Sequence, residues 1–190
     1  GMSSAASDVY KRQLFDKDGT LFRYSETWNT WCGIVLKKLS NGDGALLKNL
    51  ARAVDFDIQS QMIKPQSMVI ACTTREVAEC LEPLLTNWSL GTIEKFLNEQ
   101  ANGLPFAEVT PLKPYFSALR SGGLKVGVMT NDSEDNAMAQ LVSANLNPLD
   151  DLDFLAGYDS GYGAKPAPDP LLAFAKAVEL APSEVAMVGD

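Results

Sequence analysis

The sequence predicts an α/β fold, namely a three-layer αβα domain on a parallel sheet with a helical segment inserted into it. Two short apolar runs, 124–129 and 185–188, each end in small or polar residues, as buried parallel strands commonly do. Helical patterns separate the strands, which favours crossover connections over hairpins. The stretch 23–108 breaks this alternation and is mainly helical in pattern.

The first strand is expected at Leu14 and Phe15, directly before the motif Asp16-Lys17-Asp18-Gly19-Thr20. If the chain is extended from Leu14 to Asp18, Asp16 and Asp18 project to the same side, because strand side chains alternate. One carboxylate could then attack while the other transfers a proton. A plain turn at Asp18-Gly19 is the structural alternative. A calcium loop is excluded because Ser25 stands where a bidentate Glu is required.

The inserted stretch is expected to hold four helices, over 25–39, 45–54, 74–85 and 92–100. Ser25 suits the first N-cap, and Ser40-Asn41-Gly42 suits the end of that helix. The tryptophans of this stretch are interpreted as its core and not as substrate contacts: Trp28, Trp31 and Trp88.

A helix over 114–121 and a strand over 124–129 lead into Thr130-Asn131-Asp132-Ser133 and a helix over 133–145. A strand that opens onto a helix N-terminus presents backbone N–H groups and hydroxyls to an anion such as phosphate. Asp132 or Ser133 acting only as a helix cap is the alternative, and the two roles can coexist.

The last part predicts a strand over 153–156, a helix from 169 to about 181 and a strand over 185–188. Lys165 lies on a loop bounded by Gly163, Pro166 and Pro168, which would hold it in one place. Asp190 follows the final strand, at the edge of a parallel sheet where ligands collect.

Together and in this order, these segments resemble the haloacid dehalogenase superfamily, above all its phosphoglycolate phosphatase-type members. The resemblance implies a Rossmann-like catalytic core over 14–22 and 109–190, truncated at both ends, and a helical cap over 23–108. Residues 1–13 are interpreted as tag or foreign sequence, because polar residues precede Leu14 where a central strand should be apolar.

The resemblance also implies a role for each motif. Asp16 would be the nucleophile and Asp18 the general acid and base. The residues that it assigns to the phosphoryl group or substrate are Thr130, Asn131 and Lys165. It assigns Mg²⁺ to the Asp16 carboxylate, the Asp18 backbone carbonyl and Asp190, and oxygen ligands suit that ion.

The implied function is a Mg²⁺-dependent phosphatase acting on a small phosphorylated metabolite such as phosphoglycolate, through an aspartyl-phosphate intermediate. A phosphosugar mutase of the same superfamily is one alternative. A second is an inactive fragment that only binds phosphate and Mg²⁺. Absence of histidine excludes Ser-His-Asp and Cys-His triads, and family members that cleave carbon–halogen bonds lack an aspartate matching Asp18.

The amino-acid composition limits the classes of partner that the protein could bind. The 190 residues are 46% hydrophobic and carry a net charge of −8 without a basic cluster, which disfavours nucleic acid and anionic membrane as partners. The three cysteines lack metal-site spacing and are interpreted as reduced thiols of a cytoplasmic protein. An exposed edge of the core sheet could pair two chains, so a homodimer stays open.

Overall fold

The computed structural model describes residues 12–189. The chain divides into two compact units, one formed by Gly1–Arg23 with Glu108–Asp190 and the other by Tyr24–Ala107. The second unit begins and ends within one residue of the insertion that the sequence indicates. Each unit has its own hydrophobic core and is described separately below.

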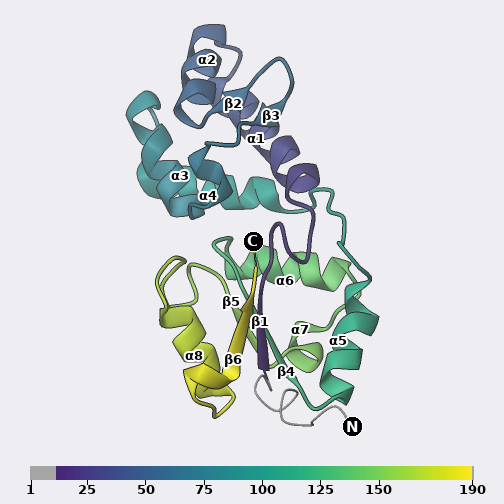
Figure 1. Ribbon diagram of the computed structural model, residues 1–190. Coiled ribbons are helices and arrows are strands. Elements are labelled where there is room, and N and C mark those ends of the chain that lie inside the picture. Colours follow the sequence, from purple (N-terminus) through teal and green to yellow (C-terminus); the bar gives the residue numbers. More distant parts are fainter. Residues whose placement is uncertain (1–11, 190) are drawn as a thin grey trace. The chain divides into compact units, whose positions relative to one another are not determined.

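The first unit is built on a parallel four-stranded sheet. Its strands are β1 (Arg12–Asp16), β4 (Lys125–Met129), β5 (Phe154–Ala156) and β6 (Val185–Val188). Their order is β5-β4-β1-β6, so β1 lies between β4 and β6 (Figure 1). Asp16 is in register with Met129, which brings the carboxyl ends of β1 and β4 to the same edge. The expected parallel α/β sheet is confirmed.

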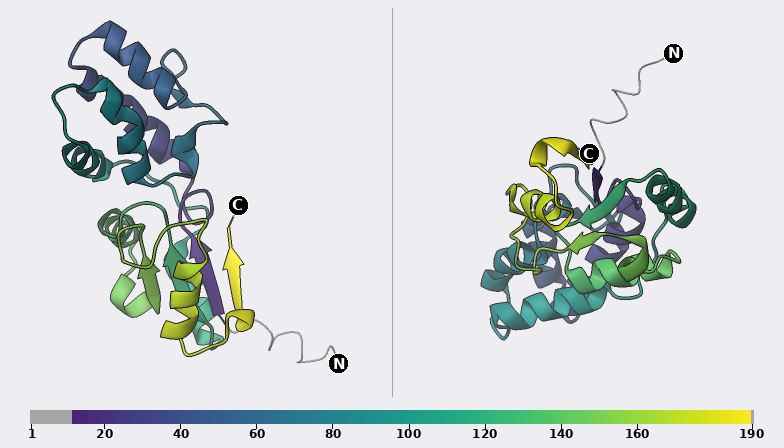
Figure 2. Two further views of the ribbon diagram at one scale, coloured as in Figure 1. Left: turned by 90° about the vertical axis from the view of Figure 1, so that its left-hand side faces the viewer. Right: turned by 90° about the horizontal axis from the view of Figure 1, so that it is seen from below.

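Helices cover both faces of this sheet (Figure 2). The helical elements are α5 (Leu112–Ser121), α6 (Glu134–Ser143), α7 (Pro148–Asp151), α8 (Asp169–Ala177) and the 3₁₀ turn η3 (Pro182–Glu184). Leu14 and Phe15 point to opposite faces because they are neighbours on a strand. Leu14 clusters with Phe174 of α8, whereas the Phe15 ring lies 5.5 Å from that of Phe116 on α5.

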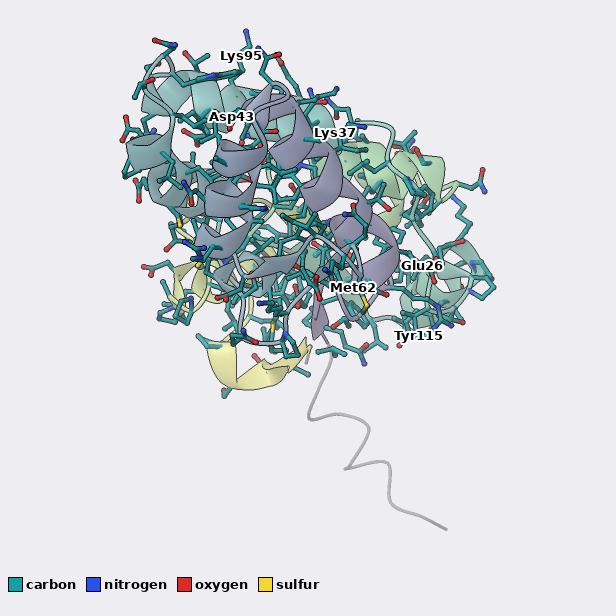
Figure 3. The ribbon with its side chains drawn as sticks, turned by 90° about the horizontal axis from the view of Figure 1, so that it is seen from above. Glu26, Lys37, Asp43, Met62, Lys95 and Tyr115 are labelled. Atoms are coloured by element: carbon teal, nitrogen blue, oxygen red, sulfur yellow. The ribbon has the colours of Figure 1, made fainter. Side chains whose placement is uncertain are left out.

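The second unit is mainly helical. Its elements are α1 (Tyr24–Ser40), α2 (Gly44–Ala53), β2 (Phe56–Asp57), β3 (Met62–Ile63), η1 (Met68–Ile70), α3 (Thr74–Leu81), η2 (Glu82–Leu84) and α4 (Leu90–Ala101). Asp43, labelled in Figure 3, caps α2 by accepting from the N–H groups of Ala45 and Leu46.

The core of this unit is formed by the apolar faces of its helices. Trp31 is buried there, and its indole N–H donates to the Leu97 carbonyl over 3.0 Å. Trp28 and Trp88 are partly buried and pack against the same cluster, so all three tryptophans contribute to the core of this unit. Among residues 12–189, no helix combines the length and apolar character needed to cross a membrane.

Several boundaries differ from the sequence prediction. The strand β1 starts at Arg12 and stops at Asp16, so it includes Arg12 and Gln13, whereas residues 1–11 of the proposed tag lie outside the described part. The helix α8 ends at Ala177, earlier than expected. Glu179 adopts a left-handed φ of 58°, and the Leu180 N–H donates back to the Ala175 carbonyl over 2.9 Å, which closes the helix.

Other elements were not expected. The short helix α7 follows Asn147, whose side chain accepts from the Leu149 N–H and so caps it. The antiparallel pair β2 and β3 consists of two residues each, too few for an alternating pattern to be visible in the sequence.

Candidate active site

Asp16 is the last residue of β1, and only 8% of its surface is exposed. The ammonium group of Lys165 pairs with its Oδ1, and the Lys17 backbone N–H donates to the same oxygen over 2.8 Å. Burial raises the pKa of Asp16, although the bonds to Lys165 and Lys17 oppose that effect. Asp16 and Lys165, which are 149 positions apart in the sequence, are therefore in direct contact.

Asp18 reaches this edge by a turn and not by continuation of the strand. The Lys17 carbonyl accepts from the N–H groups of Leu21 and Phe22, over 2.9 and 3.1 Å. Gly19 within the turn has a φ of 84°, a conformation that glycine adopts without strain. The strand ends at Asp16, so the condition for alternation as far as Asp18 is not met, although Asp18 lies close enough to Asp16 for their charges to interact.

Thr130 directly follows β4 and lies beside Asp18. Its hydroxyl donates to Asp18 Oδ2 in a long hydrogen bond of 3.4 Å and accepts from the Asp132 N–H over 3.0 Å. Ser133 is the N-cap of α6, since its side chain accepts from the Asn136 N–H. The capping role thus belongs to Ser133, and the Thr130 hydroxyl lies next to the Asp18 carboxylate.

Asn131 holds the loop that carries Lys165. Its side-chain amide donates to the Lys165 carbonyl over 2.9 Å, and its Oδ1 accepts from the Lys165 N–H over 2.8 Å. Both bonds reach the backbone, so they fix the position of the loop and leave the Lys165 ammonium group directed at Asp16. The sequence suggested substrate contact for Asn131 but gave no sign of this second role.

A buried ion cluster beside the site was missed in the sequence. The Lys17 side chain is fully buried, and its Nζ lies 2.9 Å from Asp18 Oδ2 and 3.1 Å from Asp132 Oδ2. It also donates to Gln140 Oε1 over 2.6 Å. Burial alone would lower the pKa of Lys17, but the charges of Asp18 and Asp132 outweigh it and raise that pKa. Burial raises the pKa of Asp132, while Lys17 opposes this shift.

The oxygen atoms of this edge suit a hard cation such as Mg²⁺, because Asp16 offers a carboxylate and Asp18 a backbone carbonyl. Gly189, directly after β6, lies beside Asp16, since a Cβ built on Gly189 would lie 3.2 Å from the Cβ of Asp16. Asp190, the third expected ligand, lies outside the described residues. Within 12–189, no three His, Cys, Asp or Glu side chains form a group that could hold a metal.

The family model for haloacid dehalogenase-like hydrolases matches residues 10–190. The chain belongs to this family. Members of this family are hydrolases, so the chain is a hydrolase. Its α/β fold is the one expected from the sequence. No curated protein sequence matches this haloacid dehalogenase-like hydrolase.

Solved structures with the same fold include CbbY from Rhodobacter sphaeroides in complex with phosphate, with a TM-score of 0.67 and 17% identity over 94% of this chain and 76% of that one. A predicted phosphoglycolate phosphatase from Haemophilus somnus has a TM-score of 0.65 and 16% identity over 100% and 79% of the two chains. A hydrolase from Pseudomonas syringae gives 0.63 and 16% over 95% and 76%. At these identities, the comparisons establish the fold of the haloacid dehalogenase-like hydrolase and not its substrate.

Proposed function

We propose that this hydrolase is a phosphatase that removes the phosphoryl group from a small phosphorylated metabolite through an aspartyl-phosphate on Asp16. The observation that carries the proposal is the contact between Asp16 and Lys165 at a sheet edge that also holds Asp18 and Thr130. A carboxylate nucleophile repels a phosphate dianion, so a fixed cation beside the carboxylate is what this reaction needs.

In the first step, a carboxylate oxygen of Asp16 bonds to phosphorus while the bond from phosphorus to the leaving oxygen breaks. Asp18 gives a proton to that oxygen, and Lys165 and Thr130 hold the oxygens of the transferring group. In the second step, water bonds to the phosphorus, its proton goes to Asp18, and Asp16 is released with inorganic phosphate. Asp16 is buried, so little water screens its charge and its electrostatic interaction with Lys165 is strengthened.

Asp16, the Asp18 carbonyl and Asp190 would hold Mg²⁺, which would offset the negative charge of the phosphoryl group when bound. Lys165 would perform part of this task, since its ammonium group pairs with Asp16.

The substrate class follows from chemistry and similarity together. The Haemophilus somnus structure with this fold is a predicted phosphoglycolate phosphatase, and CbbY was solved in complex with phosphate. Both support a phosphorylated small molecule such as phosphoglycolate. We further propose that the helical unit, Tyr24–Ala107, acts as a cap that selects the substrate and excludes water.

Hydrolysis of p-nitrophenyl phosphate by the whole chain, with and without Mg²⁺, tests the proposal. The Asp16→Asn variant and a chelator should each abolish phosphate release, because the first removes the nucleophile and the second the cation. Asp135→Asn is the matched control, since Asp135 is an exposed aspartate of α6. Turnover that survives Asp16→Asn would contradict the proposal.

Analysis of the products separates the alternatives. Release of free phosphate from a panel of phosphorylated metabolites identifies a phosphatase. Conversion of one sugar phosphate into its isomer without free phosphate identifies a mutase. A rise in melting temperature with phosphate or Mg²⁺, without any turnover, identifies a binding module.

A further inference from the structure

We propose that Lys17 is a positioning residue, and that its buried ammonium group orients the Asp18 carboxyl group, which takes a proton from water in one step and gives a proton to the leaving oxygen in the other. The inference rests on the proposed phosphatase function, in which Asp18 is the general acid. Lys17 occupies the position between the two aspartates of the motif. Neither the family match nor the motif gives that position a role.

The side chain of Lys17 binds the Asp18 carboxyl group directly. Its Nζ lies 3.0 Å from Asp18 Oδ1 and 2.9 Å from Asp18 Oδ2, so it contacts both carboxylate oxygens. The Thr130 hydroxyl donates to Oδ2 of the same carboxylate. Since a carboxylate held at both oxygens cannot rotate freely about its terminal bond, the side chain of Asp18 keeps one orientation at the edge of the sheet.

Lys17 is in turn held from behind. Asp132 Oδ2 lies 3.1 Å from Nζ, and Gln140 Oε1 accepts a hydrogen bond of 2.6 Å from it. Asp132 is itself fixed, because its Oδ1 accepts from the Ser133 N–H over 2.8 Å and from the Asn136 side chain over 3.2 Å. The α6 N-terminus thereby forms a rigid support for the lysine.

Exposure separates the two carboxylates by function. The Asp132 side chain is 2% exposed, whereas that of Asp18 is 17% exposed. Asp18 is therefore the member of the cluster that a substrate can reach, and Asp132 serves as the internal counter-charge. A well-packed apolar side chain could replace a buried ion pair without loss of stability, so stability alone does not account for Lys17.

Leaving-group dependence of kcat/KM is the test, because kcat/KM includes only the steps up to cleavage of the bond to the leaving oxygen. Phenyl phosphate, p-nitrophenyl phosphate and 2,4-dinitrophenyl phosphate have similar size but leaving groups of increasing acidity. Phenoxide needs a proton to leave, whereas dinitrophenoxide leaves as a stable anion. General acid catalysis contributes about 10²- to 10⁴-fold where it is needed.

The variant must remove the Lys17 charge without leaving a buried charge that has no counter-charge. Lys17→Met alone would leave the buried Asp132 carboxylate without its counter-charge, which could prevent folding. The double variant Lys17→Met/Asp132→Asn removes both charges of that internal pair. Asp132→Asn alone keeps Lys17 beside Asp18. Lys176→Met, at an exposed lysine in the last turn of α8, is the matched control for the loss of a lysine.

We expect the double variant to lose about 10- to 100-fold more kcat/KM with phenyl phosphate than with 2,4-dinitrophenyl phosphate, as Asp18→Asn should. Lys176→Met should keep the wild-type dependence on leaving group, whereas Asp132→Asn, which keeps Lys17 but removes one of its supports, should shift that dependence less than the double variant does. An equal loss with all three substrates, or no loss, would overturn the role of Lys17 while Asp18→Asn still shows the selective loss. A wild-type chain that hydrolyses none of them would overturn the phosphatase proposal, and the inference with it.

Discussion

Replacing Asn131 with alanine tests whether this side chain works through Lys165. The substitution removes the two hydrogen bonds between Asn131 and the Lys165 backbone. Each such bond contributes about 1 kcal/mol, so the loop loses about 2 kcal/mol of the free energy that holds Lys165 against Asp16. If all of it is used to place the ammonium group, kcat/KM for p-nitrophenyl phosphate falls about 30-fold.

A double-mutant cycle with Lys165→Met gives the decisive measurement. In the Lys165→Met background no ammonium group remains to be placed, so Asn131→Ala should change kcat/KM less than about twofold. The coupling energy between the two positions should then be about 2 kcal/mol, which lies within the range found for residues in contact.

An Asn131→Ala effect of equal size in both backgrounds would refute this reasoning. It would mean that Asn131 contacts the substrate independently of Lys165, as its place in the sequence motif first suggested. Thermal melting of each variant shows whether the loss reflects the site or the stability of the whole unit.

Two further predictions concern stability. A Cβ on Gly157 would lie 2.3 Å from the backbone nitrogen of Glu134. Gly157→Ala should therefore lower the free energy of unfolding by about 1–3 kcal/mol in urea titrations. Gly91→Ala, within α4 and with no heavy atom within 4 Å of the added Cβ apart from the adjacent residues and the local helix backbone, should be neutral or stabilising. Similar urea midpoints for the two variants would contradict the packing argument. Burial raises the pKa of the Cys32 thiol from 9.0 to about 12. Below pH 9 the thiol is protonated in both states, and above it only the unfolded chain ionises. Stability should then fall by about 2 kcal/mol more by pH 10.5 in the wild type than in Cys32→Ala, because Cys72 and Cys80, whose pKa values burial also raises, titrate in both proteins. Parallel pH curves would contradict this.

The sequence predicted the strands of the core sheet well, because their apolar runs are bounded by polar residues. Topology also placed Asp16 and Thr130 at the carboxyl ends of neighbouring strands. Lys165 was assigned to the site by the family resemblance alone, and its contact with Asp16 agrees with that assignment.

Side-chain partners could not be predicted in the same way. Lys17 lies between two acidic residues, and nothing local shows that its ammonium group turns inward to Asp132 and Gln140. Those partners come from another strand end and from the second turn of α6, so they depend on how the helix packs. The turn that follows β1 also depends on partners that lie later in the chain, because the Leu21 and Phe22 N–H groups donate to the Lys17 carbonyl.

The points where the chain leaves and re-enters the sheet unit are tied to each other. The Val109 N–H donates to the Leu21 carbonyl over 2.9 Å, and Phe22 forms a bridge with Glu108. The entrance and the exit of the insertion are thus neighbours within the unit that carries Asp16. Because the two ends of the insertion already lie together, a short turn could replace the insertion without distorting the unit that carries Asp16. On the cap role proposed above, exchange of this insertion would change the preferred substrate while the catalytic residues stay in place.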